Sequence, residues 1–165
     1  MSNSVVRKRR SLVTAALLAP LAVSADSVAS GVPSDCSKEI MRIVSEYAAA
    51  WHRGDPAALF AHYHDNFTLH YPGHHALAGT HIGKPAALRV LREVSARTNR
   101  KLLSVLDVMG GAHRGALNVT EEWTRDGETC VVERVFVYAV QDGKLAQCWL
   151  FDADQRVVER FLNAV

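Results

Sequence analysis

Beyond Arg100 the chain alternates between apolar and polar residues, and glycine-containing breaks divide this stretch into four segments. Two of the breaks are the Asp-Gly pairs at 126–127 and 142–143, and the first is Gly110-Gly111. An Asp-Gly pair between two alternating segments is the strongest short-range signal for a β-hairpin. The pattern predicts four consecutive antiparallel strands, at residues 101–108, 116–125, 129–140 and 145–152.

Helical periodicity dominates the chain before these strands. Apolar residues recur at intervals of three and four after Ser34 or Asp35, either of which suits a helix N-cap. Gly54 can adopt the left-handed conformation that ends a helix, and Asp55-Pro56 is typical of the start of another. The predicted elements are helices at 34–53, 56–63 and from 84 onward, a strand at 67–71, a polar loop at 74–80 and a last helix at 155–163. Helices followed by consecutive strands indicate an α+β fold with the helices on one face of the sheet.

The first 25 residues have the layout of a signal peptide. Four basic residues at 7–10 precede an apolar run that is well short of the ~20 residues needed to cross a bilayer, so no stable membrane anchor is expected. Small residues predict cleavage after Ala25 or, alternatively, after Ala29, and Arg9-Arg10 resembles a twin-arginine signal. We expect export, secreted or periplasmic, with a signal peptide at 1–25, a linker at 26–33 and one domain at 34–165. The alternative is a basic tail on a cytoplasmic protein.

Removal of this segment changes the charge of the chain. The segment contains four of the 19 Lys and Arg and none of the 17 Asp and Glu, so the mature chain has a net charge of −2. Its remaining basic residues are scattered, whereas nucleic-acid binding needs a concentrated basic face, so we expect no nucleic-acid partner. The three cysteines are an odd number, so no disulfide framework is predicted, and they form no Cys-x-x-Cys pair, so no structural zinc site is predicted.

Several short motifs accompany this order of elements: YAAAWHRGD at 47–55, YPG at 71–73, AGT at 78–80, Gly83, DGK at 142–144 and WLF at 149–151. They make residues 40–162 resemble the SnoaL-like polyketide cyclase group of the nuclear transport factor two-like superfamily. The resemblance implies a cone-shaped, curved antiparallel sheet that is wrapped around a small-molecule pocket and covered by the N-terminal helices. Isomerases, cyclases, epoxide hydrolases, dehydratases and binding proteins without catalysis all occur in this superfamily, so the fold leaves the reaction open.

Tyr47 and Tyr71 fall where ketosteroid isomerases of this superfamily carry catalytic residues. Tyr47 stands seven residues before Gly54, the spacing of the isomerase tyrosine, and its phenol could donate a hydrogen bond to a substrate oxygen. It also falls on the buried stripe of the first helix, where it could simply pack. The position of the isomerase base falls on Tyr71, a poor proton acceptor at neutral pH because the ordinary pKa of tyrosine is near ~10. A steroid isomerase is therefore disfavoured.

On the third strand of the meander, alternation assigns one face to Val132, Arg134, Phe136 and Tyr138. The resemblance implies that this face lines the pocket. Glu121 and Trp123 share a face of the preceding strand, so Glu121 could neutralise Arg134 diagonally across the sheet. The alternative is an ion pair on the outer surface with Val131, Val135 and Val137 buried, because a slip of one residue inverts every side chain.

The last strand carries the candidate general base. Alternation counted from Lys144 points Cys148, Leu150 and Asp152 inward. SnoaL-like cyclases place an acid/base aspartate on this strand, and Asp152 is the available carboxylate, next to an aromatic wall that includes Trp149. An apolar pocket rim would raise the pKa of this carboxyl toward the working pH of a base. Alternatively, Asp152 caps the terminal helix.

Six histidines lie within a span of twenty residues: His62, His64, His70, His74, His75 and His81. No two of them have the three- or four-residue spacing on a predicted helix that metal-binding pairs use, so no metal site is predicted. His70 in the strand, or His74 in the loop over the pocket mouth, could instead act as an acid or base at neutral pH.

The leading hypothesis is an enzyme without a cofactor that applies acid/base chemistry to a small, largely apolar oxygenated metabolite, as in polyketide cyclisation or isomerisation. Asp152 would be the base, assisted by His70 or His74, while Tyr47 and Arg134 stabilise negative charge on a substrate oxygen. The substrate-binding residues would be Trp51, Tyr71, Glu121, Trp123, Phe136, Tyr138, Cys148, Trp149 and Leu150.

Two other functions stay open at this point. One is an epoxide hydrolase or epoxide-opening cyclase, because related hydrolases combine Asp and Arg in one cavity. The other is a secreted binding protein without catalysis. Whichever function holds, a fairly apolar outer sheet face would fit a homodimer.

Overall fold

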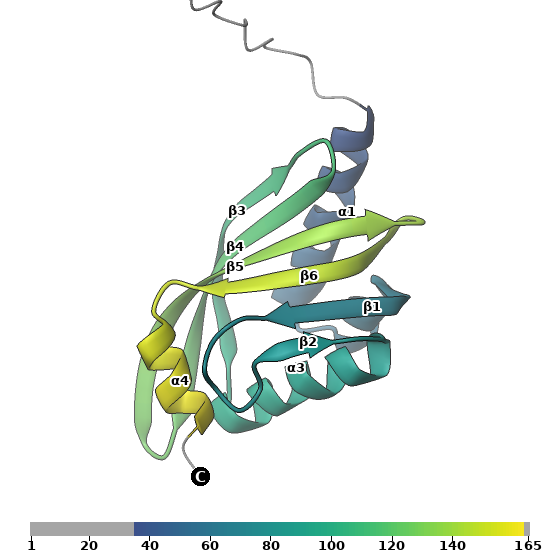
Figure 1. The fold of residues 1–165 in the computed structure, drawn as a ribbon. Helices are drawn as coiled ribbons and strands as arrows, with labels where there is room; N and C mark the ends of the chain where they lie inside the picture. The colour runs from purple at the N-terminus through teal and green to yellow at the C-terminus, as the bar shows by residue number, and fades with distance from the viewer. Residues whose placement is uncertain (1–34, 164–165) are drawn as a thin grey trace, which may run out of the picture. The chain divides into compact units, whose positions relative to one another are not determined.

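The structure is a computed structural model that describes residues 35–163, so the predicted signal peptide and linker lie outside the described residues. Figure 1 shows an α+β arrangement in which helices cover one face of a curved sheet that does not close. The predicted fold class is confirmed. The helices are α1 (Asp35–His52), α2 (Pro56–Ala61), α3 (Lys84–Thr98) and α4 (Gln155–Asn163), and the strands are β1 (Tyr63–Tyr71), β2 (Gly79–His81), β3 (Lys101–Gly110), β4 (Arg114–Arg125), β5 (Glu128–Gln141) and β6 (Lys144–Asp152).

The six strands form one sheet in the order β2-β1-β6-β5-β4-β3. The predicted meander from β3 to β6 pairs antiparallel throughout. The prediction of an antiparallel sheet is wrong at one place: β1 pairs parallel with β6, with Leu69 opposite Cys148. The predicted loop at 74–80 also reaches into β2, a short strand that pairs with the end of β1. Local periodicity missed β2 because three residues are too few to show an alternation.

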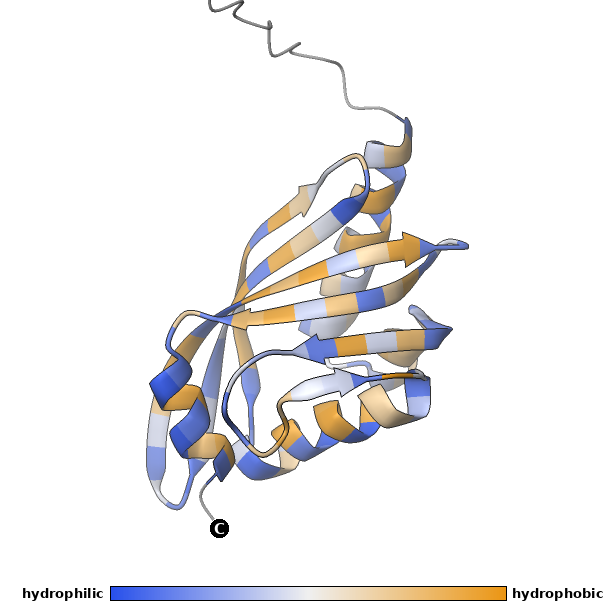
Figure 2. Cartoon of the chain, viewed as in Figure 1, coloured by the Kyte–Doolittle hydropathy of each residue, from blue (hydrophilic) through white to orange (hydrophobic). Residues whose placement is uncertain are grey.

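Both Asp-Gly pairs form the predicted hairpin turns. Asp126 and Gly127 have φ values of 51° and 83°, and Asp142 and Gly143 have values of 50° and 70°. Two consecutive residues with positive φ form the turn whose twist matches that of paired strands. The turns therefore set the register of β4, β5 and β6, and Figure 2 shows the resulting alternation of apolar and polar residues along the strands.

The helix junction also agrees with its prediction. Gly54 takes a φ of 65° after α1, and the Asp55 carboxylate accepts a hydrogen bond of 3.0 Å from the Ala58 amide at the start of α2. This junction turns the chain so that α2 begins beside the carboxyl end of α1. Helix α1 lies against β3 and β4, and α3 lies against β1. Between these helices and the sheet lies the core.

A close approach of α1 to β4 depends on Gly115. A Cβ atom at this position would lie 2.6 Å from Cγ2 of Val44 and 2.9 Å from Cγ2 of Ile40. Both distances are well below van der Waals contact between carbon atoms. The glycine thus brings the helix carrying Tyr47 directly onto the sheet.

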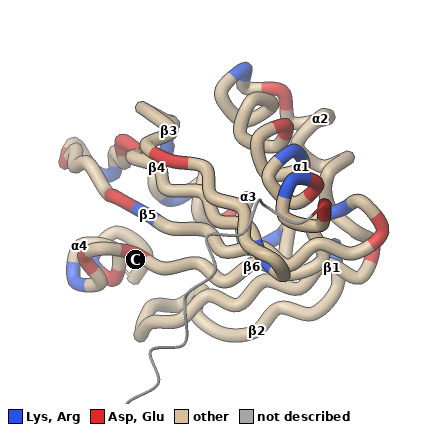
Figure 3. Tube along the Cα trace, turned by 90° about the horizontal axis from the view of Figure 1, so that it is seen from above, with Lys and Arg blue, Asp and Glu red and all other residues tan. Residues whose placement is uncertain are grey.

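The opposite face of the sheet carries exposed large apolar side chains, namely Leu103, Leu106, Met109, Val131 and Phe151. The homodimer predicted for this face stays a prediction. No helix among residues 35–163 is long and apolar enough to cross a membrane. Figure 3 shows basic and acidic residues interspersed on α1, where Arg42 pairs with Glu39 and Glu46.

Candidate functional site

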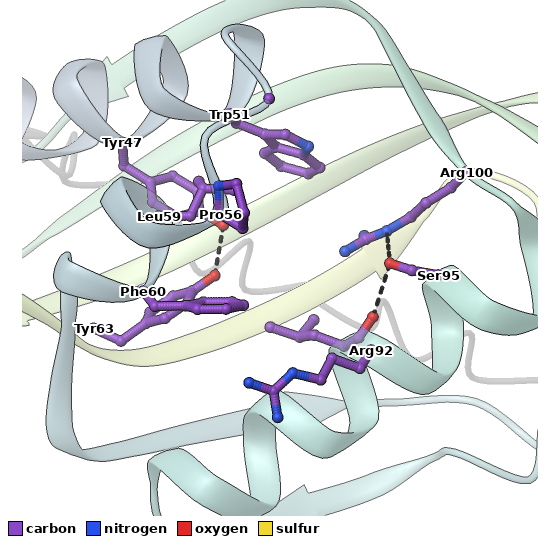
Figure 4. Close-up of a pocket in the computed structure, with 11 residues that line it drawn as sticks. Tyr47, Trp51, Pro56, Leu59, Phe60, Tyr63, Arg92, Ser95 and Arg100 are labelled. Atoms are coloured by element: carbon purple, nitrogen blue, oxygen red, sulfur yellow. Dashed lines mark hydrogen bonds between the residues drawn. The ribbon is translucent and has the colours of Figure 1, made fainter.

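A cavity of about 390 Å³ opens where α1, α2 and α3 meet the start of β3. Figure 4 shows its lining, which consists of Tyr47, Trp51, Gly54, Pro56, Leu59, Phe60, Tyr63, Leu91, Arg92, Ser95 and Arg100. A narrow inner extension of about 20 Å³ continues toward the sheet and touches Phe67, Leu69, Phe136, Tyr138 and Cys148. The lining is mainly aromatic and aliphatic with a few polar groups, which is the usual composition of a small-molecule site.

Two phenols meet at the wall of this cavity. The hydroxyls of Tyr47 on α1 and Tyr63 on β1 are 2.6 Å apart and share a hydrogen bond. Burial raises the pKa of Tyr47 and raises that of Tyr63 well above its ordinary value. Both groups therefore remain protonated at neutral pH, which leaves them as hydrogen-bond donors rather than bases.

Arg100 joins the cavity to the interior of the protein. Its Nε donates to Oγ of Ser95 over 2.8 Å, and its Nη1 donates to Oε1 of Glu121 over 3.3 Å. Its guanidinium carbon lies 5.6 Å from the centre of the Trp51 ring. Sequence reasoning missed Arg100 because it is the single residue linking Asn99 to β3, where no periodicity assigns it to a face.

Behind the cavity, Arg134 is the centre of a buried polar cluster. Its Nη1 donates to Glu121 over 3.0 Å, its Nε to Asp152 over 2.5 Å and its Nη2 to the hydroxyl of Tyr71 over 2.6 Å. The side chains of Arg134 and Glu121 are fully buried, and that of Asp152 is 1% exposed. Arg134 also lies over the Trp123 ring, 4.8 Å from its centre. Such a desolvated guanidinium is tolerated because two carboxylates surround it.

The two carboxylates of this cluster differ in their contacts. Glu121 accepts hydrogen bonds from Arg100, from Arg134 and from the indole nitrogen of Trp123 at 2.8 Å. Burial alone would raise the pKa of Glu121, but the two arginines outweigh it and lower that pKa. Asp152 uses Oδ1 for Arg134, while its buried Oδ2 has no hydrogen-bond partner among the described residues.

The sequence model of the SnoaL-like domain matches residues 44–148, which is more than half of the chain. The chain belongs to the SnoaL-like domain family. No protein with a curated function matches the chain in sequence. The predicted family membership is thus confirmed, and the match runs from the middle of α1 to the middle of β6.

Solved structures show the same fold as this SnoaL-like domain. Bal32a from a soil-derived mobile gene cassette is 20% identical with a TM-score of 0.70, and the match covers 78% of this chain and all of that one. A nuclear transport factor two-like protein from Burkholderia xenovorans LB400 is 23% identical with a TM-score of 0.64, covering 77% and 98% of the two chains. A putative SnoaL-like polyketide cyclase from Jannaschia sp. CCS1 is 14% identical with a TM-score of 0.65, covering 82% and 99%. At these identities the similarity shows the fold alone.

Strand register places most of the predicted site residues of the SnoaL-like domain on the inner face. Val131 is 62% exposed, so the alternative register, with Val131 buried and Arg134 outside, is wrong. The diagonal pairing of Glu121 with Arg134 is confirmed. The predicted residues on the inner side are Tyr47, Trp51, Tyr71, Glu121, Trp123, Arg134, Phe136, Tyr138, Cys148, Leu150 and Asp152.

Three of the predicted site residues lie elsewhere. Trp149 alternates with the inward Cys148 and Leu150, so it lies on the outer face, where it stacks on His70 with ring centres 4.9 Å apart. His70 lies outside for the same reason, as the neighbour of the inward Tyr71. The side chain of His74 is 95% exposed and lies 3.3 Å from Glu159 rather than over the cavity. Neither histidine can reach the cavity or the buried cluster.

Asp152 does not cap the terminal helix. The carboxylate of Asp154 accepts hydrogen bonds from the backbone amides of Arg156 and Val157, which is the N-cap arrangement. Asp152 instead accepts a hydrogen bond from Arg134. Sequence reasoning also left His75 without a role, although its side chain is buried beside the Tyr71 ring, with ring centres 4.3 Å apart. Burial lowers the pKa of His75, which favours the neutral form.

The inward residues form successive rungs across β5 and β6. Tyr138 is paired with Cys148 at the inner end of the cavity, Phe136 with Leu150 comes next, and Arg134 with Asp152 follows. The Phe136–Leu150 pair thus separates the cavity from the Arg134–Asp152 pair. The predicted pocket and the predicted charged residues are therefore adjacent, and Arg100 belongs to both through its contact with Glu121.

Proposed function

We propose that this SnoaL-like domain is a cofactor-independent acid/base enzyme that transfers a proton on a small, largely apolar, carbonyl-containing molecule, in a reaction of the isomerase or cyclase type. The observation that carries the proposal is the pair of protonated phenols, Tyr47 and Tyr63, held 2.6 Å apart at the wall of an aromatic cavity. Arg100 adds a positive charge to the same cavity.

These groups match the charge that proton abstraction creates. Removal of a proton next to a carbonyl places negative charge on the carbonyl oxygen. Donors that already point at this position stabilise the transition state without reorganising, and they are most effective where water is excluded. Because Tyr47 and Tyr63 share one hydrogen bond, one phenol donates to the other, and the remaining hydroxyl proton of the pair would stabilise the enolate oxygen together with the guanidinium of Arg100.

Asp152 is the proposed proton acceptor. Its Oδ2 is the one carboxylate oxygen of the buried cluster that has no hydrogen-bond partner among the described residues, while Arg134 holds Oδ1. The Phe136–Leu150 pair lies between Asp152 and the cavity, so the reacting carbon of the substrate would have to pass this pair to reach Oδ2. This role is therefore tested separately from that of the tyrosines.

An exchange assay with a small bicyclic ketone tests the proposal without the native substrate. We expect the protein to accelerate exchange of the protons next to the carbonyl of 2-tetralone in D2O, followed by NMR. Tyr47→Phe removes one donor to the enolate oxygen, so the rate should fall by about 10²–10³-fold.

Tyr71→Phe is the matched control, since it removes a buried hydroxyl that contacts Arg134 outside the cavity. Its exchange rate should stay within a few-fold of the wild-type rate. Binding of 2-tetralone without any acceleration of exchange would mean that the domain binds ligands without catalysis. An unchanged rate in Tyr47→Phe would remove the tyrosine pair from the mechanism.

The alternating row Glu121–Arg134–Asp152 favours epoxide opening as a second candidate. One carboxylate would take a proton from water as the water oxygen bonds to an epoxide carbon. The other, in its acid form, would protonate the oxygen released when the carbon–oxygen bond breaks. Incubation with cyclohexene oxide in H2¹⁸O should then give a diol containing one ¹⁸O atom, and absence of the diol rejects this candidate.

A further inference from the structure

The charged groups on the cavity wall are all of one sign. Arg92 and Arg100 contribute two guanidinium groups, and none of the eleven lining residues is an aspartate or a glutamate. Figure 4 shows that Arg92 and Ser95 come from α3 and that Arg100 follows it, opposite Tyr47 and Trp51 on α1. A cavity with low-dielectric walls and charges of one sign concentrates ligands of the opposite sign.

Arg100 is the outermost member of an alternating row of charges. The row runs from Asp152 through Arg134 and Glu121 to Arg100, and its two acids balance its two arginines. It ends on a cation at the cavity, where the Arg100 side chain is still 16% exposed. Its Nε and Nη1 are held by Ser95 and Glu121, while no described residue accepts a hydrogen bond from its Nη2. A ligand anion would continue the alternation.

Arg92 supplies the excess positive charge. It is exposed at the cavity, 5.2 Å from the centre of the Phe60 ring, and it forms no ion pair with any residue in the described part of the chain. The adjacent Glu93 is already paired with Arg97. An anion between Arg92 and Arg100 would therefore meet two guanidinium groups, one of them not neutralised by the protein.

We propose that the ligand of this cavity is a flat apolar or aromatic molecule that carries one carboxylate, bound by Arg100 and Arg92. Its ring system lies among Trp51, Phe60 and Leu91. The proposal rests on the proposed function in one respect, which is that the cavity is the ligand site. It adds a permanent negative charge on the substrate, distinct from the carbonyl oxygen that the tyrosines would bind.

Binding of two probes of equal shape tests this proposal. Isothermal titration calorimetry at low ionic strength would measure 2-naphthoate, which carries the carboxylate, and 2-acetylnaphthalene, a neutral ketone. We expect 2-naphthoate to bind about tenfold or more tightly than the ketone, since a hydrogen bond between two charged groups contributes more to affinity than one between neutral groups. Arg100→Gln and Arg92→Gln should each reduce this preference by about tenfold.

Arg89→Gln is the matched control, because it removes the same charge from an exposed position on α3 that does not line the cavity. The preference for 2-naphthoate should be unchanged in this variant. Arg100→Gln also takes a partner from the buried Glu121, so its fold is checked by circular dichroism. Arg92 is exposed and has no such partner, which keeps the test valid if Arg100→Gln unfolds.

The outcomes separate this proposal from the proposed function. Equal affinity for the two probes overturns the anionic ligand but leaves the cavity as a site for ketones. A preference for 2-naphthoate that survives both arginine substitutions overturns the assignment of the carboxylate to Arg92 and Arg100. Binding of neither probe overturns the cavity as a ligand site and, with it, both proposals.

Discussion

Replacement of Arg134 by methionine is expected to lower the free energy of unfolding by about 3–5 kcal/mol, because it leaves two buried carboxylates without their shared partner. Glu121 would keep Arg100 and Trp123, whereas Asp152 would lose its hydrogen bond of 2.5 Å. Domains of this size are stable by about 5–15 kcal/mol, so the loss is a large fraction of the total. Urea denaturation followed by circular dichroism measures it.

Arg89→Met serves as the control for Arg134→Met, since Arg89 is exposed and the same change there should alter the free energy of unfolding by less than about 0.5 kcal/mol.

The pH dependence of the free energy of unfolding gives a second check. In the wild type the pKa of Glu121 is lowered, so its stabilising contribution is present above its unfolded pKa and is lost as the pH falls through the folded value. Without Arg134 the Glu121 carboxylate is easier to protonate, so the difference in free energy of unfolding between the wild type and the variant should shrink as the pH falls below about 4.5. A deficit under about 1 kcal/mol at pH 7 would contradict the buried ion-pair network.

Replacement of Asp152 by asparagine should slow the exchange of 2-tetralone protons by about 10²–10⁴-fold if Asp152 is the proton acceptor. Asparagine has nearly the same shape, and its carbonyl oxygen can still accept from Nε of Arg134. The amide cannot take up a proton at neutral pH. The exchange rate should therefore fall strongly while the free energy of unfolding stays close to that of the wild type. NMR exchange and thermal unfolding measure the two effects separately.

Asp154→Asn provides the matched comparison for Asp152→Asn. The same chemical change two residues later falls on the N-cap of α4, where asparagine caps as well as aspartate. Its exchange rate should equal that of the wild type. A wild-type rate in Asp152→Asn would show that the Phe136–Leu150 pair keeps substrates away from the buried cluster, and Arg134 and Asp152 would then be structural.

The sequence by itself determined the meander and much of the inner face. The Asp-Gly pairs at 126–127 and 142–143 adopt the two positive φ values of a hairpin turn, and these turns hold β4, β5 and β6 in one register. Once the register is set, the period of two residues decides which side chains share a face. The resemblance to SnoaL-like cyclases indicated which face lines the pocket, and with it the inward positions of Arg134, Asp152 and Glu121 could be predicted.

Tertiary structure alone decided how these inward groups are distributed between a cavity and a sealed cluster. The parallel pairing of β1 with β6 brings Tyr71 to Arg134, 63 positions away in the chain, and no local pattern encodes that contact. Arg100, which follows α3, likewise reaches Glu121 on β4 because α3 packs beside this strand. Alternation assigns a side chain to a face, but the neighbours it meets there depend on which strands and helices pack against that face. The sequence could therefore predict the charged residues of the inner face, whereas only the packed structure separates them from the aromatic cavity and joins the two through Arg100.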